Sequence, residues 1–195
     1  MDGFQRRREQ KKTHILEATL ALIMEFGVQK VSIAEIAKEA NVSQVTIYNY
    51  FESKHNLMHA TFIYYVDKVW AEYEELLQKD IPFPEKIKQI IFTKKETAKQ
   101  IHPDFYEQLM KEYSEGFHYL ENLYNEKAIP YFIELFNQGK QQGHVDPDLS
   151  NEAILFYIQM MKEYIQREDV YQKVLPITED LTKLLFYGIV GKRDN

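Results

Sequence analysis

Residues 32–57 read SIAEIAKEANVSQVTIYNYFESKHNL, and they predict two short helices joined by a tight turn, followed by the start of a third helix. Ser32 and Glu35 have the spacing of a capping box, in which each side chain satisfies a free backbone amide at a helix start. Asn41 follows at the turn, where its tolerance of positive φ favours a sharp reversal. Ser43 then caps the second short helix. The stretch therefore predicts a helix–turn–helix unit.

The helix that begins after Ser43 has one apolar side and one polar side. Ile47 and Phe51 lie four residues apart, so both side chains point towards the same buried face. The opposite side carries hydrogen-bonding groups, a small apolar contact and phenol rings but no carboxylate: Gln44, Val45, Thr46, Tyr48, Asn49 and Tyr50. Such a surface suits the major groove of DNA, because short polar side chains can read base edges there. The alternative is a three-helix corner that exposes polar residues without reading a nucleic acid.

Charge is distributed unevenly along the chain. The net charge of −6 argues against a nucleic-acid partner for the molecule as a whole. Residues 1–60, however, hold eight Lys or Arg against seven acidic residues, and the first twelve residues hold five against two. An acidic body with a basic, arm-like N-terminus can approach a polyanion at one end. The alternative is a solvated terminal tail.

The composition excludes several classes of protein. The sequence has no cysteine, so disulfides and thiolate metal sites are ruled out. The longest apolar run, residues 153–158, is far shorter than a membrane span. No apolar stretch of the signal-peptide type follows the basic N-terminus. We therefore expect a soluble, cytoplasmic protein with no membrane partner.

Apolar residues recur at helical spacing along almost the whole chain, which predicts an all-α fold of about nine helices. The first helix is expected over residues 9–26, ending at Gly27, with a buried stripe of Ile15, Ala18, Leu22, Ile23 and Phe26. Later helices are expected at about 54–79, 84–100, 104–114, 117–142 (kinked or divided at Pro130), 151–168 and 177–190. We expect a helix–turn–helix domain in residues 1–55 and a helical bundle in residues 56–195.

Residues 13–58 resemble the DNA-binding domain of the TetR family of bacterial transcriptional regulators. The matching features are Gly27, the IAKEA of the second helix, the VS and TIYxYF of the third, and the SKxxL that opens the fourth. Asn41 stands where the family commonly has glycine, and Thr19 replaces a frequent alanine. Asparagine can adopt the same backbone conformation, so the turn is still expected.

The resemblance implies roles for individual residues. The residues expected to approach bases are Gln44, Val45, Thr46 and Asn49. Those expected to hold phosphates are Ser32, Tyr48, Tyr50 and Lys54, together with Arg6, Arg7, Arg8 and Lys11 of the basic arm. Phosphate contacts fix the register of a protein on DNA, whereas base contacts carry the sequence information.

The C-terminal part is rich in aromatic residues, which for any single residue most often indicates core. So many tyrosines are unusual for a helix-bundle core, since each buried hydroxyl needs a partner. A cavity with aromatic walls would explain them, and the resemblance implies a ligand-binding domain here. The expected pocket residues are Trp70, Tyr73, Phe105, Tyr113, Phe117 and Tyr157, and the expected ligand is an apolar or aromatic small molecule.

The last two predicted helices, NEAILFYIQMMKEYI and TEDLTKLLFYGIVG, are the most apolar segments. Two such pairs packed face to face would form a four-helix homodimer interface, which the resemblance also implies. The residues expected at this interface are Ile154, Ile158, Met161, Leu181, Leu184, Leu185, Tyr187 and Gly188. The alternative is that both helices are ordinary buried helices of one chain.

Other functions have weak support. His55 and His59 have an i, i+4 spacing that can hold a metal, but no matching carboxylate motif accompanies them. The chain lacks a glycine-rich phosphate loop and a nucleophile elbow, so we expect neither enzyme activity nor a cofactor. The expected partners are a DNA operator, a second copy of the chain and a hydrophobic effector. The alternatives are an architectural or partner-recruiting DNA-binding dimer without an effector, and a protein-interaction bundle that does not bind DNA.

Overall fold

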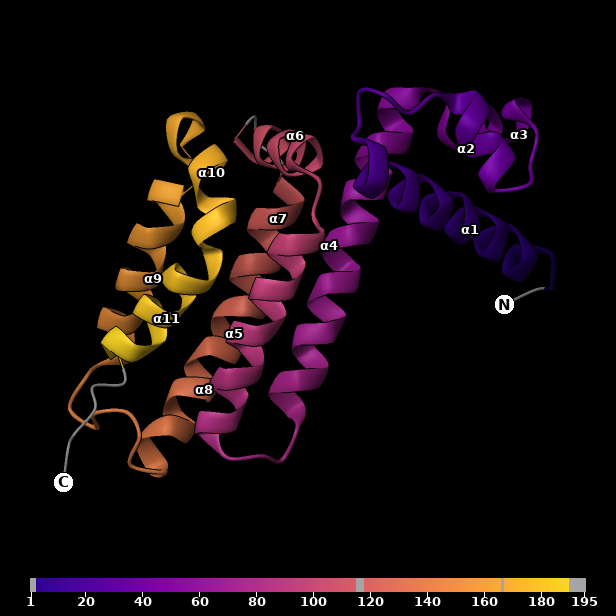
Figure 1. The fold of residues 1–195 in the computed structure, drawn as a ribbon. Helices are drawn as coiled ribbons and strands as arrows, with labels where there is room; N and C mark the ends of the chain where they lie inside the picture. Colours follow the sequence, from indigo (N-terminus) through magenta and orange to yellow (C-terminus); the bar gives the residue numbers. More distant parts are fainter. Residues whose placement is uncertain (1–2, 115–117, 166, 190–195) are drawn as a thin grey trace. The chain divides into compact units, whose positions relative to one another are not determined.

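The computed structural model describes residues 3–114, 118–165 and 167–189, and these residues form helices joined by short connections, without a strand (Figure 1). The predicted all-α fold is confirmed. The helices are α1 (Gly3–Phe26), α2 (Ile33–Glu39), α3 (Gln44–Phe51), α4 (Lys54–Gln78), α5 (Phe83–Gln100), α6 (Pro103–Ser114), α7 (His118–Leu123), α8 (Ile129–Gln141), α9 (Asn151–Ile165), α10 (Glu168–Val174) and α11 (Thr178–Ile189). None of the described helices is both long enough and apolar enough to cross a membrane.

The chain divides into two compact units, which differ from the predicted division at residue 55. The first unit comprises residues 1–69 and 101–109, and the second comprises residues 70–100 and 110–195. The first half of α4 belongs with the helix–turn–helix because its buried side chains, among them Leu57 and Phe62, complete that core. Phe105 joins the same core, with its ring centroid 5.4 Å from that of Phe62.

The first unit is built on α1, whose Ile15 and Ile23 are fully buried. Thr19, also fully buried, donates its hydroxyl to the Ile15 carbonyl oxygen at 2.7 Å, so the polar group is satisfied inside the helix. Phe26, by contrast, was predicted to be buried and is 46% exposed. The helix also begins at Gly3 rather than near residue 9, so the basic residues expected in an arm are helical.

Gly27 ends α1 with a φ of +86°, as its predicted role in a left-handed cap requires. A Cβ atom at this position would lie 2.8 Å from Oδ2 of Asp104 and 3.0 Å from a ring carbon of His102. The same Asp104 oxygen accepts a hydrogen bond from the backbone N–H of Gln29 at 3.1 Å. Glycine is therefore needed both for the backbone conformation and for the close approach of the segment that begins α6.

In the second unit, α5, α8, α9 and α11 lie side by side around one apolar core (Figure 1). The core centres on Phe83, Leu135, Phe136, Ile154 and Phe186. An ion network ties α5 to α11, since Glu179 accepts hydrogen bonds from Lys183 and from Lys95. These bonds, with Lys183 contributing most, lower the pKa of Glu179 to about 2.

The helices of the second unit depart from expectation in two places. The segment predicted over 117–142, kinked or divided at Pro130, consists of α7, a π-helical turn at Tyr124–Ala128 and α8, so it carries an additional short irregular element. This irregularity comes directly before Pro130, which has no N–H to donate within the helix. The short helix α10 was not predicted, and its N-cap residue, Arg167, makes no side-chain capping hydrogen bond that the sequence could have shown.

Candidate nucleic-acid interface

Helix α3 is fixed to the first unit along one side. Ile47 is fully buried and Phe51 is 5% exposed, as predicted. At the start of the helix, Ser43 Oγ accepts the backbone N–H of Thr46 at 3.0 Å. At its end, Glu52 adopts a φ of +65° and donates its N–H to the Tyr48 carbonyl oxygen at 2.8 Å. Both ends of the helix are therefore held in place before any ligand is bound.

The start of α2 and the turn between α2 and α3 also have the predicted geometry. Ser32 Oγ accepts the backbone N–H of Glu35 at 3.2 Å, and the Glu35 carboxylate accepts the backbone N–H and the hydroxyl of Ser32 in return. Hydrogen bonds from Ser32 are the main reason that the pKa of Glu35 is lowered, and the positive charge of Lys54 contributes as well. Asn41 takes a φ of +49°, so it replaces glycine at the turn as expected.

The outer side of α3 is open. Val45 is 66% exposed and Tyr48 is 46% exposed, and Gln44 and Asn49 are exposed as well. Thr46 and Tyr50 are half-buried, and the Thr46 hydroxyl lies 2.9 Å from that of Ser43. No acidic residue occurs within α3. This side of the helix therefore combines hydrogen-bonding groups with an accessible methyl surface and carries no charge that would repel DNA.

A basic groove lies between the start of α1 and the α2–α3 region. Its volume is about 800 Å³, and its walls include Arg7, Arg8 and Lys11 on one side and Asn49 and Tyr50 on the other. The guanidinium carbon of Arg8 lies 5.8 Å from the centre of the Tyr50 ring, a cation–π distance. Among the described residues, no acidic side chain lines the groove. The early start of α1 thus places positive charge beside α3.

The other predicted phosphate contacts are placed differently. Arg6 is exposed on α1 but does not line the groove, and Lys54 is half-buried at the start of α4. The hydroxyl and the backbone N–H of Ser32 both donate to Glu35, so both donors are already in use. The role of each of these residues in phosphate binding stays a prediction.

The predicted dimer residues fall into three groups by exposure in the single chain. Ile154 and Ile158 are 2% and 7% exposed and belong to the core of the second unit. Met161, Leu181 and Leu185 are half-buried, whereas Leu184, Tyr187 and Gly188 are exposed. The exposed apolar residues of α9, which the prediction missed, are Phe156 (67%), Met160 (47%) and Tyr164 (60%). Their spacing of four residues was visible in the sequence as a second apolar stripe.

The predicted pocket residues do not form a single group. Phe105 is fully buried in the core of the first unit, against the rings of Phe62 and Tyr65, and has no surface left for a ligand. Tyr157 is half-buried on α9. Phe117 lies outside the described residues, as does the side chain of Tyr113.

Trp70 and Tyr73 have a feature that a packed core does not explain. Trp70 Nε1 and the Tyr73 hydroxyl are both buried, and neither has a hydrogen-bond partner among the described residues. The Trp70 ring lies 5.5 Å from the ring of Tyr131 on α8, and Lys94 Nζ lies 4.9 Å from the centre of the Tyr73 ring. Buried donors without partners are costly, so this point favours a group that offers a hydrogen-bond acceptor.

No group of three or more His, Asp or Glu residues in the described part of the chain could hold a metal ion. His55 is exposed and His59 is half-buried, both on α4.

Comparison with known proteins places this interface in a family. The family model described as "Bacterial regulatory proteins, tetR family" matches residues 15–61. The chain is 31% identical to the uncharacterized HTH-type transcriptional regulator YuxN of Bacillus subtilis (strain 168) over 160 residues, which cover 65% of this chain and 50% of YuxN. It is 20% identical to the HTH-type transcriptional repressor KstR2 of Mycobacterium tuberculosis, over 76% of each chain. The chain thus spans only half of the length of YuxN.

The fold also occurs in solved structures. The structure of the fatty acid degradation regulator FadR from Bacillus halodurans superposes with a TM-score of 0.61 at 19% sequence identity, covering 95% of this chain and 97% of that one. At this identity the likeness shows a shared fold.

Proposed function

The chain belongs to the TetR family of bacterial transcriptional regulators, and we propose from this premise that it is a homodimeric repressor of transcription. In this proposal it binds a near-palindromic operator on the bacterial chromosome, in the cytoplasm, and an apolar or aromatic small molecule releases it. The observation that carries the proposal is the outer side of α3, which is open, free of carboxylates and bordered by a basic groove.

Base recognition is assigned to the first turns of α3 and to Asn49. Gln44 and Asn49 can each pair bidentately with adenine, while Val45 and the methyl group of Thr46 can contact thymine methyl groups. The capped ends of α3 support this assignment, because a reading helix must be rigid before it enters the groove.

Phosphate binding is assigned to the residues around α3. Arg7, Arg8 and Lys11 line the basic groove, and they supply the positive charge that an acidic protein needs to approach a polyanion. Tyr48, Tyr50 and Lys54 on α3 and α4 are further candidates, as are Arg6 on α1 and Ser32 before α2. These contacts would hold the register of α3 on the duplex.

The homodimer is assigned to the exposed apolar side of α9 and α11. Phe156, Met160 and Tyr164 on α9 and Leu184 and Tyr187 on α11 are all between 47% and 67% exposed in the single chain. A monomer rarely leaves so many large apolar side chains of neighbouring helices in water. Pairing through this side would supply the two copies of α3 that a palindromic operator requires.

The binding site for the effector is assigned to the region of Trp70 and Tyr73. Their buried donors have no partner among the described residues, which favours a ligand with one or two hydrogen-bond acceptors. The apolar part of such a ligand would pack against the aromatic rings. The name of the FadR structure describes that protein as a regulator of fatty acid degradation, which is compatible with an apolar effector for this fold.

Replacing Asn49 with alanine tests base reading. We expect Asn49→Ala to weaken binding to the preferred duplex by about 1–3 kcal/mol, because a bidentate contact to one base is lost. The loss should vanish when the contacted base pair is changed, so the variant is measured by fluorescence anisotropy on a set of duplexes with single substitutions. Equal weakening on every duplex would refute the assignment.

Lys54→Ala provides the matched control, because a phosphate contact carries no sequence information. We expect it to weaken binding to all duplexes alike and to reduce the slope of log K against log salt by about one unit. An unchanged slope would count against Lys54 as a phosphate contact, and it would leave the result for Asn49 intact.

The single tryptophan of the chain allows a direct test of the effector site. We expect fatty acids or aromatic acids that bind near Trp70 to quench or shift its fluorescence, and the same compounds to release the operator duplex at similar concentrations. Trp70 lies in the second unit, so the signal reports on that region rather than on α3. Compounds that alter the fluorescence without releasing DNA would favour a DNA-binding dimer that does not respond to an effector.

A further inference from the structure

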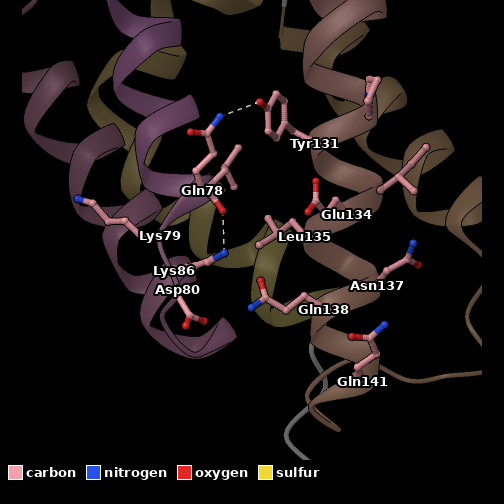
Figure 2. A pocket seen from close by; sticks show the side chains of 13 residues that line it. Gln78, Lys79, Asp80, Lys86, Tyr131, Glu134, Leu135, Asn137, Gln138 and Gln141 are labelled. Atoms are coloured by element: carbon pink, nitrogen blue, oxygen red, sulfur yellow. Dashed lines mark hydrogen bonds between the residues drawn. The ribbon is translucent and has the colours of Figure 1, made fainter.

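The second unit has a polar cavity that the prediction from sequence did not include. It lies between the end of α4, the start of α5 and α8, and its volume is about 680 Å³. Figure 2 shows side chains of α8, among them Glu134 and Gln138, facing the end of α4 and Lys86 of α5. The size lies within the range of small-molecule sites in proteins. Its polar lining sets it apart from the aromatic surroundings of Trp70 and Tyr73.

Lys86 is the central residue of this cavity. It is only 6% exposed, and its ammonium group donates one hydrogen bond, to the carbonyl oxygen of Leu77 at 2.7 Å (Figure 2). Leu77 lies in the last turn of α4, so this bond satisfies a free carbonyl at a helix end. An ammonium group has three N–H donors, and Lys86 takes part in no ion pair within the described part of the chain. Two of these donors therefore have no partner among the described residues.

The rest of the lining limits the charge that the cavity can accept. Lys79 is exposed and already paired with Glu75 at 3.8 Å, so among the described lining residues Lys86 supplies the buried positive charge. The carboxylates of Asp80 and Glu134 are exposed in the lining, and they would repel an anion with several negative charges. The site is therefore suited to a single negative charge.

The remaining polar groups are neutral amides and a phenol. The side-chain amides of Gln138 and Gln141 are in the lining and make no hydrogen bond with other described residues (Figure 2). The Tyr131 hydroxyl accepts from Gln78 Nε2 at 3.2 Å and donates to Glu74 at 2.9 Å, which closes one edge of the cavity. Free amides both donate and accept, so they match hydroxyl groups on a ligand.

We propose that this cavity is a binding site for a small hydroxylated monocarboxylate. The ligand carboxylate would accept the spare N–H donors of Lys86, and its hydroxyl groups would pair with the amides of Gln138 and Gln141. Tyr131 borders both this cavity and the apolar region proposed near Trp70, but the hydroxylated ligand is held by Lys86 and the amides rather than by the aromatic rings. Its binding does not depend on whether the chain represses transcription.

The test is a calorimetric titration of the full-length protein with sodium gluconate and sodium lactate. Gluconamide, a neutral counterpart of gluconate, and inorganic phosphate are titrated in parallel. We expect one of the two hydroxy acids to bind, with gluconamide and phosphate at least tenfold weaker. Absence of binding by both acids, or equal binding of gluconate and gluconamide, would overturn the proposal. Tighter binding of phosphate would overturn the assignment to a monocarboxylate.

Two variants link the binding to the cavity. Lys86→Met should reduce the affinity at least tenfold, whereas Lys88→Met, an exposed lysine two residues along the same helix, should not change it. Since Lys86 also holds the end of α4, a second variant, Gln138→Leu, removes a ligand contact without touching that bond. It should weaken binding at least threefold with an unchanged circular dichroism spectrum. Wild-type affinity in both Lys86→Met and Gln138→Leu would overturn the proposal.

Discussion

Ile47→Ala is expected to lower the free energy of unfolding of the first unit by about 2–5 kcal/mol, which is the usual cost of truncating a buried isoleucine. Ile47 is fully buried and is one of two side chains that anchor α3 to the core, so the cavity left by the change cannot be filled from solvent. Hydrogen exchange at the amides of α1–α3 in the full-length protein measures this loss directly.

Val45→Ala is the matched control, since it shortens an apolar side chain two residues away on the same helix. Val45 is 66% exposed, so the free energy of unfolding should stay within about 0.5 kcal/mol of the wild-type value. DNA affinity should nevertheless fall, because a contact with a thymine methyl group is removed. If both variants destabilised the unit equally, α3 would not have the buried and open sides described above.

Phe156→Glu is expected to have the second large effect, on the association of two chains. The proposed interface would bury Phe156 against the partner, and a carboxylate there would be desolvated without a counter-charge. Aromatic residues at the centre of an interface typically contribute about 2–4 kcal/mol, so dimerisation should weaken by at least about 30-fold. Sedimentation equilibrium should then show monomers at concentrations where the wild-type protein is dimeric.

Phe92→Glu is the control for this change. Phe92 is 64% exposed, almost the same as the 67% of Phe156, but it belongs to α5, which is not part of the proposed interface. It should leave the association unchanged. If Phe92→Glu dissociated the dimer and Phe156→Glu did not, the interface would have to be assigned to α5.

The sequence allowed the helix–turn–helix to be predicted almost residue by residue, because its signals are local. The capping box at Ser32, the turn at Asn41 and the cap at Ser43 each depend on residues within three or four positions. The start of α1 was placed too late because the run of Arg, Gln and Lys was interpreted as a charged tail. The same residues favour helix, which the structure extends to Gly3.

The remaining errors come from tertiary packing, which short stretches of sequence do not specify. Helix α9 has two apolar stripes, and the hydrophobic pattern alone could not show that Ile154 and Ile158 are buried while Phe156 is exposed. Phe105 was assigned to a ligand pocket because the packing of the start of α6 with the first unit is not encoded locally. The cavity at Lys86 depends on three helices whose relative positions no short motif specifies.

The central claim is that the open side of α3 reads DNA in a pair of identical chains. Selection from a library of random DNA duplexes, followed by sequencing of the bound fraction, tests it most directly. We predict enrichment of a near-palindrome whose half-sites are about 10–10.5 base pairs apart, or a multiple of that spacing, from centre to centre. When the selection is repeated with Asn49→Ala, the preference for a particular base should be lost at one symmetric pair of positions in the site. The account would be contradicted if no sequence were enriched at low salt. It would also be contradicted if Asn49→Ala enriched the same site with the same base preferences as the wild-type protein.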